Sequence, residues 1–168
     1  MRVEGVALVV PGDDVDTDVM YPGAYLNVED PDQMAQYLFE GFDPTLRERL
    51  VDGTILVVGA NFGIGSSREQ AASVLVHLGL AAVIAPSYSG LYFRNAFNVG
   101  LLLLTAREAD RIDDGEALSF DARAGVVTRA DGRSLRCDPI PGFLLDMVDA
   151  GGLLPQLKRR LTNPTERS

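Results

Sequence analysis

Cysteine and histidine are nearly absent from this 168-residue chain, which contains one of each, Cys137 and His77. A single cysteine excludes a disulfide framework within the chain and a metal site built from three or four thiolates. A single histidine excludes a metal centre built from several imidazoles. The sequence therefore predicts no metal site and no cofactor held by this chain alone.

Long apolar runs and a surplus of positive charge are also missing. No apolar run approaches the roughly 20 residues of a membrane-spanning helix, and the N-terminus lacks the small-residue cleavage pattern of a signal peptide. The formal net charge of −9 at pH 7 disfavours binding to nucleic acid or to an anionic membrane surface. We expect a cytoplasmic globular protein that binds neither nucleic acids nor membranes.

The first two thirds of the chain alternate between apolar runs and helical patterns. Continuous apolar segments predict buried strands over residues 3–10, 53–60, 80–87 and 101–106. Helices are expected over residues 30–42, 67–79 and 89–100. The first of these has Asp30 as its N-cap and Pro31 at its first position, with Gly41 near its end. Apolar strands that alternate with helices are typical of a mostly parallel sheet in an α/β domain.

From Ala117 the pattern changes. Alternating residues around Asp131-Gly132 predict β-hairpins, and the chain then returns to helix with a break at Gly151-Gly152. A chain of this length forms one domain with a sizeable core. We therefore expect a single α/β domain over residues 1–162, including a β-hairpin segment and a C-terminal helix, followed by a loose tail at 163–168.

The segment "NFGIGSSREQAA", residues 61–72, joins a predicted strand to a predicted helix. Ala72, Val76 and Leu80 follow at helical spacing. Gly63 and Gly65 permit a tight turn and the close approach of a ligand to the backbone. Free N–H groups and the positive end of the helix dipole meet at such a turn, so it is suited to anion binding.

Arg68 is the residue of this turn that a purely structural interpretation explains least well. Ser66 or Ser67 can cap the helix, which is a sufficient structural reason for one of them. A cation in the first helical turn, however, opposes the helix dipole, and a bound carboxylate or phosphate would resolve the conflict. Both interpretations, an anion site and a plain capped helix, stay open. The glycine spacing fits neither a P-loop nor a dinucleotide fingerprint.

The acidic turn after the first strand places Asp14, Asp16 and Asp18 at alternate positions. A calcium loop would need glycine and glutamate where this chain has Val19 and Tyr25. One interpretation is a surface turn whose carboxylates accept hydrogen bonds from backbone N–H groups. The alternative is that Asp16 or Asp18 contacts the region of Arg68.

Three further polar residues are candidates for the site. Arg94, at the start of a helix after a strand, either faces the crevice at the carboxyl ends of the strands or braces the acidic turn, and we favour bracing. His77 is expected to be a packed or helix-end residue rather than a catalyst. Cys137 has no activating partner in the sequence and is expected to be inert.

Three motifs in order along the chain resemble one family. They are "GDDVDTDVMYPGAYL" (12–26), "NFGIGSSREQAA" (61–72) and "AVIAPSYSGLYFRNAFNVGL" (82–101). Together they resemble the small subunits of 3-isopropylmalate dehydratase and homoaconitate hydratase, and the C-terminal segment resembles that of the family as well. These subunits correspond to the swivel domain of aconitase, so the resemblance implies a three-layer β/β/α domain.

The resemblance implies a hydro-lyase that isomerises 2-hydroxy di- or tricarboxylic acids by removing water and adding it back the other way. By position, Ser66 would be the base that takes a proton from carbon, and Arg68 would bind a substrate carboxylate. Ser67 would supply hydrogen bonds, and Gly63 and Gly65 would let backbone amides face the substrate. Helix N-terminal amides and an arginine are suitable groups to stabilise a serine alkoxide.

The resemblance also implies a partner and a cofactor. A [4Fe-4S] cluster on a separate large subunit would bind the substrate hydroxyl and a carboxylate. This chain would bind no cofactor, would be inactive alone, and would work in a heterodimer or heterotetramer.

The residues after Tyr25-Leu26 would contact the variable group of the substrate. Asn27 carries no charge to pair with an extra carboxylate, and Val28 suits an isopropyl group, so isopropylmalate is favoured. Homoaconitate hydratase or another 2-alkylmalate or methylcitrate-type hydro-lyase is the alternative within the family. A non-catalytic anion-binding or regulatory module is the alternative of another class.

Overall fold

The structure is a computed structural model that describes residues 1–66 and 68–162. At its centre lies one seven-stranded sheet with the strand order β4-β3-β2-β1-β5-β6-β7. The strands are β1 (Arg2–Val9), β2 (Thr54–Val57), β3 (Ala82–Ala85), β4 (Leu103–Thr105), β5 (Ala117–Asp121), β6 (Val126–Arg129) and β7 (Ser134–Arg136).

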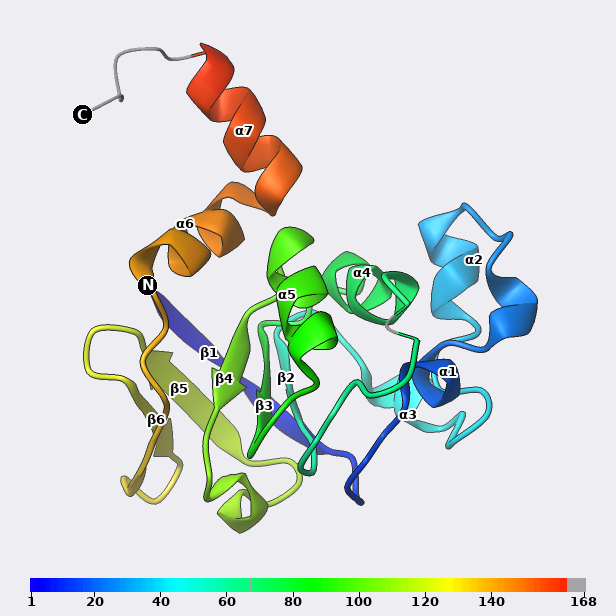
Figure 1. Cartoon of the computed structure of the whole chain (residues 1–168). Coiled ribbons are helices and arrows are strands. Elements are labelled where there is room, and N and C mark those ends of the chain that lie inside the picture. Colours follow the sequence, from blue (N-terminus) through cyan, green and yellow to red (C-terminus); the bar gives the residue numbers. More distant parts are fainter. Residues whose placement is uncertain (67, 163–168) are drawn as a thin grey trace.

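Strands β1 to β4 form the parallel half of the sheet. Every residue of β2 and β3 is buried, as expected for strands covered on both faces. Helices α4 (Gln70–His77) and α5 (Gly90–Asn98) connect these strands and lie side by side against the sheet (Figure 1). Parallel pairing in this half brings the carboxyl ends of β1 and β2 together, and the predicted site residues follow those two strands.

Strands β5 to β7 form the antiparallel half, which joins the parallel half through β1. The predicted hairpin at Asp131-Gly132 connects β6 to β7, and Gly132 has a φ of 84° there. Arg129 is buried in this half, where its guanidinium donates to Glu116 and Asp113. The predicted α/β class with a hairpin segment is confirmed, and the hairpin strands continue the same curled sheet as the parallel strands.

The segment between β1 and β2 contains short helices. They are α1 (Thr17–Met20), the 3₁₀ turn η1 (Gly23–Tyr25), α2 (Pro31–Ala35) and α3 (Leu46–Arg49). The predicted cap is confirmed, since Asp30 accepts a hydrogen bond from the N–H of Asp32. The predicted end near Gly41 is wrong, because α2 stops at Ala35. Phe39 then adopts a φ of 58° and donates its N–H to the carbonyl of Met20, which an uninterrupted helix would not allow.

Helix α4 buries a different set of residues from the one that the spacing predicted. Its core face consists of Ala71, Ala72, Val74 and Leu75, and the helix ends at His77. Val76 is only partly buried, and Leu80 lies beyond the helix. Leu80 is buried because the chain turns back toward β3 at Gly79, which has a φ of 78°.

The C-terminal helix is broken at Gly151-Gly152, as the sequence predicted. Helix α6 (Gly142–Ala150) ends at Gly151, and α7 (Leu153–Thr162) begins after Gly152. Both glycines have positive φ angles, 84° and 117°. A short 3₁₀ turn, η2 (Ala109–Arg111), lies between β4 and β5. None of the helices in the described ranges is long and apolar enough to cross a membrane.

Candidate active site

Two loops that are far apart in the sequence form the framework of the site. The acidic turn follows β1, and the glycine turn follows β2. The two turns pair through a short parallel bridge between Asp16 and Ile64. The N–H of Thr17 donates to the carbonyl of Ile64 at 2.9 Å, and the N–H of Gly63 donates to Val15 at 2.9 Å. These hydrogen bonds fix the register of the two turns.

Gly63 and Gly65 are required by their surroundings as well as by their backbone angles. Their φ values are 80° and 90°, in the region that favours glycine. A Cβ on Gly63 would lie 2.2 Å from Cγ of the buried Tyr92, and one on Gly65 would lie 2.4 Å from Oδ1 of Asp16. The two glycines therefore allow α5 and the acidic turn to approach this backbone closely.

Ser66, Asp18 and Arg68 form one hydrogen-bonded cluster. The Ser66 hydroxyl donates to Oδ1 of Asp18 at 2.9 Å. The Nε of Arg68 donates to the same oxygen. One carboxylate thus orients both residues to which the family resemblance gives chemical roles. The alternative in which Asp18 contacts the region of Arg68 is confirmed.

The charge of Asp18 is stabilised by these contacts. Hydrogen bonds from Arg68 first and Ser66 second lower the pKa of the Asp18 carboxyl below its usual value. Asp18 is therefore an anion at neutral pH, and it acts here as a counter-ion and hydrogen-bond acceptor.

The guanidinium of Arg68 is packed closely. The Arg68 side chain is 17% exposed, and its Nη1 is buried with no hydrogen-bond partner among residues 1–66 and 68–162. A Cβ on Gly23 would lie 2.7 Å from Nη1, so the backbone of η1 covers the guanidinium. A buried donor of this kind is costly unless an acceptor reaches it. The role of Gly23 is not predicted by the sequence, where Pro22-Gly23 indicates only a break in regular structure.

The rest of the acidic turn has the structural role that the other interpretation gave it. Asp16 caps α1 by accepting the N–H of Asp18 at 2.7 Å. Asp13 accepts the N–H of Ala60, and Asp14 accepts a hydrogen bond from the side chain of Asn61, both at 2.8 Å. Asp16 therefore supports the site through the turn.

Of the two serines that could cap the helix, Ser66 does not do so. Helix α4 begins at Gln70, its N-cap is Glu69, and no side chain caps it. Ser66 lies four residues before the helix and directs its hydroxyl to Asp18 instead. Arg68 likewise precedes the first helical turn, and its carbonyl accepts the N–H of Ala71. Ser67, predicted to bind substrate, lies outside the described residues.

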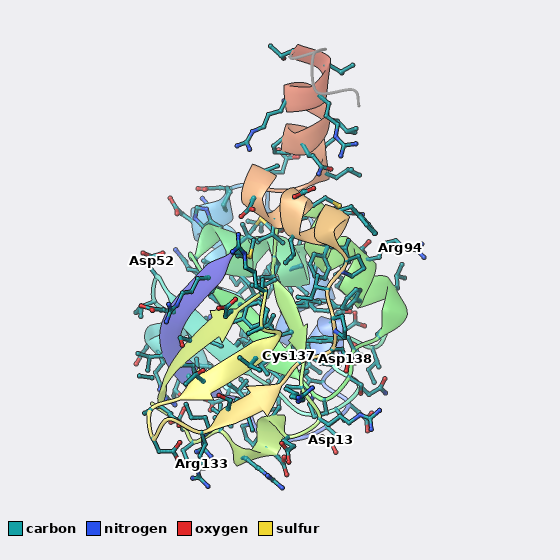
Figure 2. All side chains as sticks on the ribbon, turned by 90° about the vertical axis from the view of Figure 1, so that its left-hand side faces the viewer. Asp13, Asp52, Arg94, Arg133, Cys137 and Asp138 are labelled. Carbon is teal, nitrogen blue, oxygen red and sulfur yellow. The ribbon has the colours of Figure 1, made fainter. Side chains whose placement is uncertain are left out.

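Arg94 does not brace the acidic turn. It lines a groove between α5 and the C-terminal helices, and Figure 2 shows it well separated from Asp13. Within residues 1–66 and 68–162 it forms no ion pair with the acidic turn, because that face of α5 is turned toward α6 and α7. His77 is the last residue of α4 and contacts Asp32 at 2.8 Å, as expected of a helix-end residue.

The segment after η1 reaches the start of α4. Val28 is partly buried and lines a small hollow together with Glu69 and Gln70, which adjoin Arg68 in the sequence. Asn27 is exposed. Tyr25 stacks on Tyr37 with ring centroids 3.7 Å apart, which ties η1 to the chain after α2. The segment after α1 therefore contains an ordered 3₁₀ turn.

Metal-binding residues do not gather anywhere in the described part of the chain. No group of three or more histidine, cysteine, aspartate or glutamate residues there could hold a metal ion. Burial raises the pKa of the Cys137 thiol to about 11, so this cysteine is a neutral thiol at physiological pH.

Comparison with known proteins identifies the class of this fold and site. The family model "Aconitase C-terminal domain" matches residues 4–109, which include both turns of the site. A crystal structure of 3-isopropylmalate dehydratase from Methanocaldococcus jannaschii has a TM-score of 0.90 and 36% identity, with 100% of each chain covered. The fold is thus that of the aconitase-type swivel domain.

Sequence relatives narrow the class further. The 3-isopropylmalate dehydratase small subunit 1 of Archaeoglobus fulgidus is 42% identical, over 85% of this chain and 89% of its own. The 3-isopropylmalate dehydratase small subunit of Oleidesulfovibrio alaskensis is 40% identical, over 96% of this chain and 97% of its own. This chain belongs to the family of 3-isopropylmalate dehydratase small subunits.

Proposed function

We propose that this chain is the small subunit of a two-subunit hydro-lyase that converts 2-isopropylmalate to 3-isopropylmalate. In this reaction water leaves the substrate and returns with the hydroxyl on the neighbouring carbon. The proposal is supported by the family, since its relatives are named as 3-isopropylmalate dehydratase. The observation that carries it is the contact of Ser66 and Arg68 with one oxygen of Asp18.

Ser66 takes the proton from carbon in this proposal. A serine hydroxyl is a weak base, so its alkoxide needs positive charge nearby. Arg68 supplies that charge, because its guanidinium shares the Asp18 oxygen with the Ser66 hydroxyl. Asp18 orients both side chains and is a positioning residue.

Arg68 binds a substrate carboxylate. A guanidinium donates in a planar fork that matches a carboxylate, and Nε of Arg68 is already engaged by Asp18. The donors left for the substrate are on Nη1 and Nη2. Since η1 covers Nη1, a carboxylate reaches that donor when the backbone at Gly23 shifts. Gly65 and Ser67 are proposed to add hydrogen bonds from the same turn.

The substrate assignment rests on the segment from Tyr21 to Asp30, which contains no lysine, arginine or histidine. A substrate with an additional carboxylate would leave that charge unpaired there, which costs free energy. Val28 is an apolar side chain of this segment, and it lines the same hollow as Gln70, the first residue of α4. It is suited to contact an isopropyl group, with Asn27 at the rim.

The proposal includes a large subunit, since the relatives are named small subunits. A [4Fe-4S] cluster on that subunit would supply a Lewis acid for the substrate hydroxyl and one carboxylate. In this arrangement this chain contributes the proton acceptor and the carboxylate clamp, and the large subunit contributes the cluster ligands. The assembly is a heterodimer or heterotetramer.

The test is reconstitution with large subunits encoded in the same genome. The cluster is rebuilt anaerobically, and absorbance of the unsaturated intermediate is followed with 2-alkylmalates, homocitrate and citrate. We expect turnover of 2-isopropylmalate that is absent without this chain. Ser66→Ala should abolish nearly all turnover and leave substrate binding intact, whereas Ser134→Ala, an exposed serine on β7, should change neither.

Two results would contradict this proposal. Turnover of homocitrate or citrate in place of 2-isopropylmalate would overturn the substrate assignment. Full turnover by the Ser66→Ala assembly would overturn the role of Ser66 as the base.

A further inference from the structure

A hollow opens between α4, α2 and the segment that follows η1. It has a volume of about 370 Å³, in the range of pockets that hold whole small ligands. One wall begins with Glu69, the residue after Arg68 in the sequence. The opposite wall follows η1, whose Gly23 covers the Arg68 guanidinium. Both walls therefore start at the arginine that is proposed to bind a substrate carboxylate.

The far wall of the hollow is made by two packed helices. Met34 on α2 lines it and is only 8% exposed. Ser73 on α4 also lines it, three positions after Gln70, so these two residues lie on one side of the helix. His77 at the end of α4 contacts Asp32 of α2 at 2.8 Å, which ties the two helices together (Figure 1). The far wall is therefore held in place by tertiary contacts.

The charged side chains that line the hollow are both acidic. They are Glu29 and Glu69, and no lysine, arginine or histidine in the described ranges lines it with them. Neither glutamate forms an ion pair with another residue in the part of the chain that the structure describes. An anionic group in the hollow would meet two carboxylates and no cation, so the hollow disfavours such a group and admits an uncharged one.

We propose that this hollow receives the alkyl group of the substrate and that Met34 and Ser73 limit the size of the group that enters. The inference rests on the proposed function, in which Arg68 binds a carboxylate and Val28, which lines the same hollow, contacts the alkyl group. The volume exceeds that of an isopropyl group, so longer alkyl groups enter until they reach the far wall. Glu29 excludes substrates that carry a further carboxylate.

The first test compares substrates of increasing size in the reconstituted enzyme: 2-methylmalate, 2-isopropylmalate and 2-isobutylmalate. Ser73→Leu adds bulk at the far wall, so the ratio of kcat/KM for 2-isobutylmalate to that for 2-methylmalate should fall by about tenfold or more. Met34→Ala removes bulk from the same wall and should raise this ratio. Ser134→Leu is the matched control, because it makes the same change at an exposed position on β7 and should leave the ratio as in the wild type.

The second test examines the exclusion of charge. Homocitrate is measured as a competitive inhibitor of 2-isopropylmalate turnover. Glu29→Lys replaces a carboxylate of the hollow with a cation, so the inhibition constant of homocitrate should fall by about tenfold. Glu48→Lys, the same change on the exposed surface of α3, should leave that constant unchanged.

The outcomes separate this inference from the proposed function. Absence of 2-isopropylmalate turnover by the wild-type assembly would overturn the proposed function, and the inference with it. If the wild type is active, an unchanged substrate ratio in Ser73→Leu would overturn the role of the far wall alone. An equal fall of kcat/KM for all three substrates would do the same, because it would indicate displaced catalytic residues. Unchanged inhibition by homocitrate in Glu29→Lys would overturn the exclusion of charge.

Discussion

At the scale of single residues, Asp18 determines the geometry of the site. One of its oxygens accepts hydrogen bonds from both Ser66 and Arg68, and its carboxyl pKa is lowered by Arg68 first and Ser66 second. Hydrogen bonds to a charged group are about twice as strong as neutral ones. The negative charge of Asp18 therefore holds the arginine and the serine in one arrangement.

Replacement of this charge is expected to impair the reaction. Asp18→Asn keeps the size of the side chain but weakens both hydrogen bonds, so we expect kcat/KM to fall by about 10- to 100-fold. Steady-state kinetics of the reconstituted enzyme would measure this loss. Asp14→Asn is the control, because Asp14 accepts only from Asn61 among the described side chains. Equal kinetics for the two variants would argue against a positioning role for Asp18.

At the scale of elements, the turn after β2 depends on glycine at position 65. Gly12 and Gly65 have similar φ angles of 96° and 90°, so alanine carries a similar backbone strain at either position, roughly 1–2 kcal/mol. A Cβ on Gly12 meets open space, whereas one on Gly65 would lie 2.4 Å from the Asp16 carboxylate. The two positions thus differ mainly in the clash.

A comparison of alanine substitutions at these two positions should therefore distinguish the effect of backbone strain from the effect of displacing the site residues. Gly65→Ala is expected to lower the midpoint of urea unfolding more than Gly12→Ala does, and to abolish most turnover because it displaces Ser66. Equilibrium unfolding and kinetic assays of both variants would measure these effects. Equal loss of activity in the two variants would show that the clash with Asp16 is unimportant.

The segment over residues 21–30 is expected to be ordered by the partner or the substrate. Gly23, Ala24, Leu26 and Asn27 are exposed, and η1 covers Arg68; under the proposed role of Arg68, substrate binding changes this contact. Hydrogen exchange should be faster over residues 21–30 in the free chain than in the assembled enzyme. The buried strand β3 should be protected in both and serves as the reference. Strong, equal protection of residues 21–30 in both states would contradict the expectation.

At the scale of the whole molecule, lowered carboxyl pKa values make stability dependent on pH. Hydrogen bonds lower the pKa of Asp18, Asp43, Asp114, Glu116, Asp121 and Asp131. A lowered folded-state pKa means that the unfolded chain binds more protons than the folded chain in the acidic range. These groups contribute fully to stability at pH values above their ordinary pKa, which is 3.8 for aspartate and 4.5 for glutamate. This contribution is lost as the pH falls through the lowered pKa values of the folded state.

Glu116 offers the sharpest test of this acid dependence. Its side chain and that of Arg129 are only 10% and 8% exposed, and the hydrogen bonds from Arg129 are the main cause of its lowered pKa. Glu116→Gln should lower the urea midpoint at pH 7, and its difference from wild type should shrink toward pH 3. Glu48→Gln, on the exposed surface of α3, is the control. A pH-independent difference would contradict this linkage.

The sequence by itself determined the class of fold, and it predicted which turn carries the chemistry. Apolar runs specify buried strands because their side chains have to leave water, and this local pattern predicted β1 to β4. Glycine, serine and arginine between β2 and α4 indicated an anion site, because turn geometry and helix termini are local properties. The break at Gly151-Gly152 was predicted for the same reason. The catalytic role of Ser66 stays a prediction.

Tertiary structure decided which distant residues meet. Ser66 and Asp18 are 48 positions apart, and only the parallel register of β1 and β2 brings their turns together. The packing of α5 against α6 and α7 directed Arg94 away from the acidic turn, and the fold of η1 brought Gly23 onto Arg68. Local patterns contain no information about such contacts, because each depends on how whole elements pack against one another.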